Sequence, residues 1–433
     1  MYKKFIKKIE GRNLTVGIIG LGYVGLPLAA RINQTKQNVI GFDIDKTKID
    51  NLKKGKSYIK HIDFKLIKKH FENKLFFPTD DFSHISQCDV IVICVPTPLG
   101  KNNQPDISYI QQTIKSISPH VKKGQLITLE STTYPGTTKE EICAYFEEKG
   151  FTIGQELFVG YSPEREDPGN LNFNTQNTPK IVGGRTKECI NVASMFYSVF
   201  IDNVVKVSSL EVAEMAKLLE NTYRSVNIGL INEMKVISDK MKIDLYEVID
   251  AASTKPFGFT PFYPGPGIGG HCIPIDPFYL SWKAKEYDAD AKFIELAGEV
   301  NKRMPDYIVD QIAEILNTRS KALSKSKILI LGLSYKKNVD DTRESPSFSV
   351  ISKLIKKGAD VCFSDPFRKK FPRNRECNYQ IKSVGINEDI AMFDIIVLMT
   401  DHDDFDYEYI IEHSQVIYDT RGRMKAIEKK IYR

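Results

Sequence analysis

The residue with the clearest chemical potential is Cys272, which stands in a segment rich in glycine and proline, residues 265–276. Glycines at this density form a flexible loop in which backbone can approach a ligand and a thiol stays accessible. A thiolate can add to an aldehyde, and the resulting thiohemiacetal can lose a hydride to give a thioester, which water hydrolyses to a carboxylate. A buried, inert cysteine is the alternative. The flanking glycine, histidine and proline favour a catalytic role.

Two further candidates, Lys217 and Asn221, stand four residues apart in a segment with a helical apolar period, so they share one face of the expected helix. A cation and an amide on one face could be directed at a reacting oxygen. A solvent-facing polar pair is the alternative, and the spacing alone favours that alternative.

A nucleotide-binding pattern, Gly-x-Gly-x-x-Gly, follows the first expected strand, and Asp43 closes the second. In this context the glycines allow a tight turn and let a pyrophosphate approach a helix N-terminus, while the carboxylate can bond the adenosine ribose. An acidic residue there would repel a 2′-phosphate, which favours NAD over NADP. A purely structural turn is the alternative. We expect NAD to contact Gly20, Gly22, Tyr23, Val24, Gly25 and Asp43.

Two later segments, residues 95–98 and 131–136, follow strand-like runs at the carboxyl edge, where open parallel sheets place ligands. Ordinary turns explain these segments equally well. The two segments add Thr97 and Thr132 to the expected cofactor site.

The elements that must position these residues alternate between apolar strand-like runs and helical periods, which indicates parallel α/β units. A doubly wound NAD-binding domain is expected over residues 1–207, with strands at 15–20, 38–43, 89–95, 125–130 and 156–160. The opening pattern recurs near the other end of the chain and predicts a second Rossmann-like domain over residues 319–433. Because this second domain lacks the glycine triplet, we expect it to bind a different ligand or a different part of one.

The middle of the chain, residues 208–318, has helical character. Ser208 and Glu211 fit a capping box that opens one long helix, and helical patterns at 244–252 and 290–316 flank a loop rich in glycine and proline. The long helix could link two domains or form a subunit interface. The predicted fold is therefore α/β, with two Rossmann-like doubly wound domains joined by a central helical region with one long helix.

Composition narrows the class of protein. The 433 residues are 42% hydrophobic, and 61 Lys+Arg against 55 Asp+Glu are spread in short runs. This distribution is typical of solvated faces and compatible with a small anionic substrate. The seven cysteines form no CxxC pair or zinc spacing. Since no signal peptide or membrane-length apolar run is present either, we expect a cytoplasmic protein with no metal, no nucleic-acid partner and no membrane span.

The sequence resembles the UDP-glucose/GDP-mannose dehydrogenase family over nearly its full length. The motifs that carry the resemblance occur in order as GLGYVGLP, VPTP, STTYPGTT, YSPER, KLLENTYR, GIGGHCIPIDP and SYKKNVDDTRESP. The long versions around residues 161–170 and 257–287 look most like the UDP-N-acetylglucosamine 6-dehydrogenases of bacterial surface-polysaccharide pathways. The resemblance implies four-electron oxidation of the C6 alcohol of a UDP-sugar by NAD, in a homodimer or higher homo-oligomer.

The resemblance also implies roles for single residues. Cys272 matches the nucleophile, Lys217 the lysine that stabilises oxyanions, and Asn221 the amide beside it. Glu164 matches the glutamate that handles protons and water, Thr132 a hydroxyl that places this water, and Asp276 an aspartate that supports the lysine and the water. Lys336 falls on a substrate contact and Arg343 on a cofactor contact. The expected substrate contacts are Glu164, Lys217, Asn221, Tyr263, Gly269 and Lys336.

One departure bears on the sugar. Family members that oxidise UDP-glucose commonly have a lysine three residues after the cysteine, where this chain has Ile275. A 2-acetamido sugar, with UDP-N-acetylglucosamine foremost, is therefore expected, and UDP-glucose and UDP-N-acetylmannosamine are the alternatives. A one-step 3-hydroxyacid dehydrogenase, which shares the Lys-x-x-x-Asn helix, and a non-catalytic NAD-binding protein are more distant ones.

Overall fold

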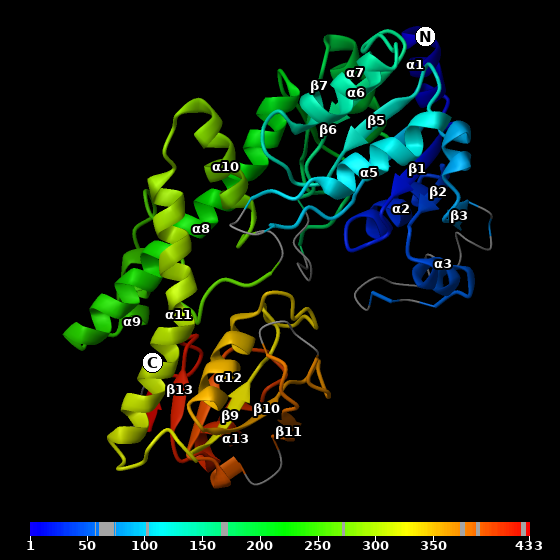
Figure 1. Cartoon of the computed structure of the whole chain (residues 1–433). Coiled ribbons are helices and arrows are strands. Elements are labelled where there is room, and N and C mark those ends of the chain that lie inside the picture. The colour runs from blue at the N-terminus through cyan, green and yellow to red at the C-terminus, as the bar shows by residue number, and fades with distance from the viewer. Residues whose placement is uncertain are drawn as a thin grey trace. The chain divides into compact units, whose positions relative to one another are not determined.

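The computed structural model describes residues 1–56, 58–59, 73, 75–100, 104–165, 172–270, 273–372, 377–386, 390–425 and 430–433. Cys272, the predicted nucleophile, lies outside the described residues. The chain divides into two compact units: residues 1–220 with 278–290, and residues 221–277 with 291–433. Figure 1 shows the elements of both.

The first unit contains an eight-stranded sheet in the order β3-β2-β1-β4-β5-β6-β7-β8. All neighbours are parallel except β6 and β7. The expected strands are confirmed, with each end within two residues of its expected position. The strands are β1 (Thr15–Ile19), β2 (Asn38–Phe42), β3 (Phe76–Thr79), β4 (Val90–Ile93), β5 (Leu126–Leu129), β6 (Phe158–Tyr161), β7 (Lys180–Gly184) and β8 (Val204–Lys206).

Helices cover this sheet because each presents an apolar stripe to it. In α1 the stripe consists of Phe5 and Ile9. The pattern of the sequence did not predict this helix. The helices are α1 (Tyr2–Glu10), α2 (Gly25–Gln34), α3 (Lys46–Lys53), α5 (Ser108–Ile117), α6 (Ala144–Glu148) and α7 (Lys187–Tyr197), with 3₁₀-helices η1 (Phe82–Gln87), η3 (Ser118–His120) and η5 (Lys285–Tyr287) and a π-helical η4 (Thr138–Cys143).

The long helix is confirmed as α8 (Leu210–Met241), 32 residues in length. The expected cap is one residue off, because the hydroxyl of Ser209, and not that of Ser208, accepts the amide hydrogen of Val212. The helical patterns that follow are α9 (Leu245–Ser253), which the carboxylate of Asp244 caps, and α11 (Lys292–Asn317). The glycine and proline-rich loop ends in a further helix, α10 (Asp276–Ala284).

The second unit contains a six-stranded parallel sheet in the order β11-β10-β9-β12-β13-β14. Two Rossmann-like sheets and one long helix confirm the predicted fold class; the three-part division at residues 207 and 318 stays a prediction. The elements are β9 (Lys327–Leu331), α12 (Pro346–Lys356), β10 (Asp360–Ser364), β11 (Lys382–Ser383), η6 (Ile390–Met392), β12 (Ile395–Leu398), α13 (Tyr407–His413), β13 (Ile417–Asp419) and β14 (Ile431–Tyr432).

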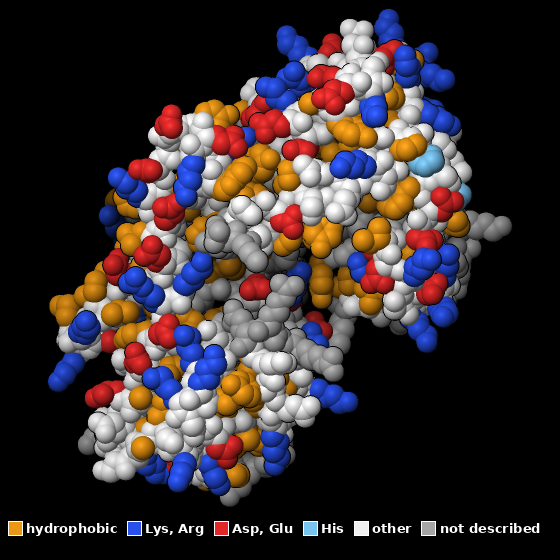
Figure 2. Space-filling view, in the orientation of Figure 1, with side chains coloured by type: hydrophobic (Ala, Val, Ile, Leu, Met, Phe, Trp, Pro, Cys, Tyr) orange, Lys and Arg blue, Asp and Glu red, His pale blue; other side chains and the backbone are white. Residues whose placement is uncertain are grey.

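Charged side chains of both signs are interspersed over the face that Figure 2 shows. This is the distribution that the short, scattered runs of lysine in the sequence lead us to expect. Within the described ranges, no helix combines the length and the apolar character that crossing a membrane requires.

Candidate functional site

A glycine cradle lies where β1 gives way to α2. Gly20 has φ +92°, in the left-handed region that favours glycine. A Cβ on Gly25 would lie 1.9 Å from the carbonyl oxygen of Gly20, so only glycine lets the helix start this close to the strand. By contrast, no described atom lies within 4 Å of a Cβ built on Gly22. The turn is therefore crowded at Gly25 and open at Gly22.

The carboxylate of Asp43 lies beside this turn, at the end of β2. Its Oδ2 accepts the amide hydrogen of Leu21 at 2.9 Å and is 2.9 Å from Nζ of Lys48, and its Oδ1 accepts the amide hydrogen of Asp45. These contacts fix the carboxylate at the mouth of the cradle. An open glycine turn at a helix N-terminus with a fixed carboxylate fits a dinucleotide, whose pyrophosphate would lie over Gly22 and whose ribose would face Asp43.

The two strand-end segments lie side by side, because the Ser131 hydroxyl at the end of β5 donates to the carbonyl of Val95 at 2.7 Å. Thr97 is buried, and its carbonyl accepts the hydroxyl of Tyr279 at 2.7 Å. Thr132 is half-buried. The structure thus brings both threonine segments to the carboxyl edge of the first sheet.

Lys217 and Asn221 are both buried on α8, so the solvent-facing interpretation is wrong. Nζ of Lys217 donates to the backbone carbonyl of Glu164 at 2.5 Å, which brings two of the predicted catalytic residues together. One turn further on, Nδ2 of Asn221 donates to Oδ2 of Asp276 at 2.5 Å. Asp276 is also buried, and its oxygens orient the amide of Asn221.

The glycine-rich loop packs against residues 334–344 of the same unit. The amide of Gly270 donates to the carbonyl of Arg343 at 3.1 Å, and a Cβ on Gly269 would lie 2.6 Å from Cβ of Tyr335. Gly269 therefore allows a close backbone approach directly before His271 and Cys272, which lie outside the described residues. Tyr263, from the same loop, is exposed and donates its hydroxyl to Asp250.

The segment 334–344 carries the remaining predicted contacts. Lys336 is half-buried, and the guanidinium of Arg343 forms a bidentate pair with the carboxylate of Asp341. This pairing fixes the side chain of Arg343, the residue whose backbone carbonyl accepts the amide hydrogen of Gly270.

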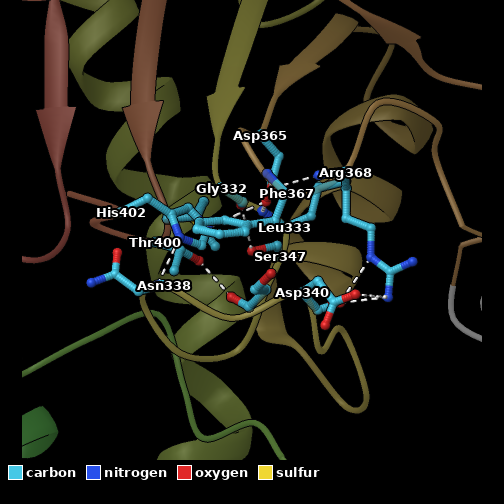
Figure 3. A network of polar contacts seen from close by, with 12 residues as sticks. Gly332, Leu333, Asn338, Asp340, Ser347, Asp365, Phe367, Arg368, Thr400 and His402 are labelled. Atoms are coloured by element: carbon cyan, nitrogen blue, oxygen red, sulfur yellow. Dashed lines mark hydrogen bonds and ion pairs between the residues drawn. The ribbon is translucent and has the colours of Figure 1, made fainter. Parts of the chain in front are cut away.

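Figure 3 shows how this segment is held. The hydroxyl of Thr400 donates to the carbonyl of Ser334, and Nε of Arg368 donates to the carbonyl of Asp340 at 2.8 Å. Between them, Nδ1 of the fully buried His402 accepts the amide hydrogen of Asn338 at 2.9 Å. Three side chains thus hold the segment from the second sheet.

The side chains of Thr400, Arg368 and His402 form a clamp on segment 334–344, and Asp365 lies next to His402. Its Oδ2 accepts the amide hydrogen of Leu333 at 2.7 Å and is 3.4 Å from Nε2 of His402. Burial would raise the pKa of Asp365, but hydrogen bonds from His402 and from backbone amides outweigh it and hold the pKa below its ordinary value. Asp365 therefore stays ionised and orients the imidazole.

Sequence reasoning missed a buried polar network beside Glu164, formed by Glu130, Lys180 and Tyr197. The signal that could have found it is Lys180, a lysine at the start of the apolar run of β7. Among the residues that the structure describes, no three His, Cys, Asp or Glu side chains cluster in a way that could hold a metal ion.

Comparison with known proteins finds one family in three consecutive parts of the chain. Residues 14–201 match the NAD binding domain of the UDP-glucose/GDP-mannose dehydrogenase family, residues 211–303 its central domain, and residues 329–426 its UDP binding domain. The match to the NAD binding domain agrees with the glycine cradle and Asp43, and the match to the UDP binding domain covers the clamped segment.

Individual relatives cover almost all of the chain. A UDP-N-acetyl-D-glucosamine 6-dehydrogenase of Pseudomonas aeruginosa is 35% identical over 91% of this chain and 92% of its own. A UDP-N-acetyl-D-mannosamine dehydrogenase of Methanococcus maripaludis is 35% identical over 90% of this chain and 86% of its own. The solved UDP-D-ManNAc dehydrogenase of Pyrococcus horikoshii superimposes with a TM-score of 0.87 at 29% identity, over 97% and 98% of the two chains. The chain therefore belongs to the UDP-glucose/GDP-mannose dehydrogenase family, and it is an NAD-dependent UDP-sugar 6-dehydrogenase.

Proposed function

We propose that the enzyme oxidises the C6 alcohol of a UDP-N-acetylhexosamine, with UDP-N-acetylglucosamine as the first choice, to the uronate through a thioester on Cys272. The observation that carries this proposal is the pair of buried contacts on successive turns of α8, Lys217 with Glu164 and Asn221 with Asp276. A buried lysine and a buried amide, each oriented by its neighbour, are the groups that oxyanion stabilisation requires.

The residue roles follow from the chemistry of each stage. Lys217 and Asn221 stabilise the C6 alkoxide and later the oxyanion of the thiohemiacetal that Cys272 forms with the aldehyde. Glu164, Thr132 and Asp276 hold the water that hydrolyses the thioester. NAD, when bound, accepts the hydride in each of the two oxidations.

The scheme balances in atoms and electrons. The alcohol loses a hydride and a proton to give the aldehyde, and the Cys272 sulfur then bonds to the aldehyde carbon. The thiohemiacetal loses a second hydride and a proton to give the thioester. Water replaces the sulfur, which leaves as thiol. One alcohol, two NAD and one water therefore give one carboxylate, two NADH and three protons.

Cofactor and substrate contacts complete the proposal. The glycine cradle and Asp43 hold the pyrophosphate and adenosine ribose of NAD, and Arg343 contacts the cofactor from segment 334–344. Proposed cofactor contacts are Gly20, Gly22, Tyr23, Val24, Gly25, Asp43, Thr97, Thr132 and Arg343. Proposed substrate contacts are Glu164, Lys217, Asn221, Tyr263, Gly269 and Lys336.

Two observations support a 2-acetamido sugar. Ile275 stands where enzymes for UDP-glucose commonly have lysine, and both curated relatives described above are named for 2-acetamido sugars. Because those two relatives are equally similar to this chain, the epimer rests on the resemblance of the two long motifs. A uronate of this kind would serve as a precursor of surface polysaccharide. The six described cysteines are free thiols, which supports a reducing, cytoplasmic setting.

A homodimer is part of the proposal because α8 exposes a long apolar stripe. At about 1.5 Å per residue, the 32 residues of α8 extend about 48 Å, more than one small domain needs. Exposed apolar side chains recur at helical spacing along it, at Val212, Met215, Leu219, Tyr223, Leu230, Met234, Ile237 and Met241. A second copy of the chain would bury such a stripe.

The experiment that tests the substrate compares UDP-GlcNAc, UDP-GalNAc, UDP-ManNAc and UDP-glucose at equal concentration, following NADH absorbance. We expect kcat/KM for UDP-GlcNAc to exceed that for UDP-glucose by about 100-fold, because contacts to one substituent, here the 2-acetamido group, can discriminate by about this factor. UDP-glucose as the best of the four would contradict the assignment drawn from Ile275.

A further inference from the structure

A buried ion pair lies directly behind Glu164 in the first unit. Nζ of Lys180, at the start of β7, is 2.9 Å from Oε2 of Glu130, and both side chains are almost fully shielded from solvent. Oε1 of Glu130 accepts the hydroxyl of Tyr197 from α7 at 2.7 Å. Each carboxylate oxygen of Glu130 therefore has a partner, Oε2 the ammonium group of Lys180 and Oε1 the hydroxyl of Tyr197.

The same ammonium group also faces Glu164. Nζ of Lys180 is 3.7 Å from Oε2 of Glu164 and 3.4 Å from the carbonyl of Pro163. Glu164 in turn accepts the Lys217 ammonium on its backbone carbonyl. Glu130 stands two residues before Thr132. One lysine thus connects the strand end that carries Thr132 with the loop that carries Glu164.

The charges around Lys180 come from several elements. Glu130 lies at the end of β5, Glu164 follows β6, Tyr197 lies on α7 and Cys94 follows β4. Burial lowers the pKa of Lys180, but the carboxylates of Glu130 and Glu164 outweigh it and raise the pKa above its ordinary value. Burial raises the pKa of both Cys94 and Tyr197 well above their ordinary values, so these two groups stay neutral. Lys180 is then the cation that separates two carboxylates.

We propose that Lys180, held by Glu130, is a positioning residue that fixes the carboxylate of Glu164 for hydrolysis of the thioester. This inference rests on the proposed role of Glu164. Without Lys180, Glu164 would lose the ammonium group that lies 3.7 Å from its Oε2, and the buried Glu130, whose pKa burial already raises, would take up a proton. A Glu164 carboxylate that is no longer held in place could not take the proton of the attacking water, so the thioester would persist.

The test replaces Lys180 by Met and mixes the variant with UDP-N-acetylglucosamine and NAD. We expect kcat to fall about 100-fold, the lower range of a general base's contribution, with little change in KM for either ligand. Intact-mass spectrometry of the quenched enzyme should show the sugar adduct accumulating on the protein.

A charge-conserving variant separates charge from mere structure. Lys180→Arg keeps a positive charge beside both carboxylates, so kcat should recover about tenfold over Lys180→Met. The matched control is Lys235→Met, which removes an equally buried lysine of α8 from its partner Asp239. This control should form no adduct.

The outcomes distinguish the inference from the proposed function. If wild type yields two NADH per sugar and Lys180→Met forms no adduct, the inference alone is overturned. A Lys180→Arg variant no faster than Lys180→Met also overturns it. Wild type that yields one NADH per sugar overturns the proposed function, and the inference falls with it.

Discussion

Two regions of the molecule carry the same arrangement of a glycine, a leucine and an aspartate. In the first sheet, the amide of Gly20 donates to the carbonyl of Phe42 at 2.8 Å, and that of Leu21 to Oδ2 of Asp43 at 2.9 Å. In the second sheet, the amide of Gly332 donates to the carbonyl of Ser364 at 2.9 Å, and Leu333 repeats the contact with Asp365 at 2.7 Å. The glycines have φ +92° and +87°.

The space around the two turns differs. In the first sheet the turn continues at once into α2, and no described atom fills the position above Gly22. In the second sheet the residue that corresponds to Gly22 is Ser334, which is buried, and the ring of His402 packs against that of Phe367 with 5.0 Å between centroids (Figure 3). The protein's own side chains occupy the second turn.

One backbone arrangement therefore serves two purposes in this protein. In the first sheet the aspartate and the open Gly22 form the cradle that we propose for NAD. In the second, the aspartate orients His402, which holds the segment carrying Lys336 and Arg343. Fold similarity alone therefore does not identify the ligand, because the side chains above the turn decide what fits.

The largest expected effect comes from filling the first turn. Gly22→Val adds a side chain to open space, so the melting temperature should stay within a few degrees of wild type. The same side chain blocks the pyrophosphate, and we expect the Kd for NAD to rise about 100-fold, or about 2.7 kcal/mol. Fluorescence titration with NAD measures this. Unchanged affinity would show that the cradle does not hold the cofactor.

A change at the glycine of the second turn should affect folding instead of binding. A Cβ on Gly332 would lie 2.4 Å from Cβ of Thr400, and Gly332→Ala requires a positive φ. We therefore expect a loss of about 2 to 3 kcal/mol in the free energy of unfolding. Gly258→Ala is the control, since its φ is +71° without a described neighbour within 4 Å, and it should cost about 1 kcal/mol. Urea denaturation of both variants checks the difference, and equal losses would contradict the filled second turn.

The clamp should act on the substrate more than on NAD. His402→Leu removes the acceptor for the Asn338 amide, and we expect KM for the UDP-sugar to rise about tenfold. KM for NAD should rise less, because Arg343 keeps its own pairing with Asp341. His402→Asn can retain that acceptor and should lose less. An equal rise in both KM values would mean that the clamp supports the fold in general.

The smallest effect concerns acid stability. The pKa of Asp365 is below its ordinary value in the folded protein, so its contribution to stability is complete above the unfolded value of about 3.9 and is lost as the pH falls through the folded value. The free energy of unfolding of wild type should therefore drop below about pH 4 more steeply than that of Asp365→Asn. Parallel curves for the two proteins would remove this role of Asp365.

The sequence predicted what depends on local pattern. The glycine turn and Asp43 could be identified because strand, turn and helix follow one another within a short stretch, and Lys217 and Asn221 because helical spacing fixes their shared face. The burial of that pair could not be predicted, since Glu164 and Asp276 come from distant segments. The cap moved from Ser208 to Ser209 because two adjacent serines fit the same pattern.

Contacts that depend on strand order were out of reach. Glu130, Lys180 and Tyr197 meet because β5, β6 and β7 are neighbours in the sheet and α7 covers them, whereas the three residues are separated widely in the sequence. The parallel between Asp43 and Asp365 was visible as a repeated strand ending in aspartate. The side chain that occupies the second turn, His402, was not.

The measurement that tests the central claim most directly is the number of NADH formed per UDP-sugar consumed, in wild type and in Cys272→Ala. Two hydride transfers joined by a covalent intermediate predict a ratio of two for wild type and no uronate from the variant. A ratio of one for wild type, or uronate formed by Cys272→Ala at the wild-type rate, would contradict the account.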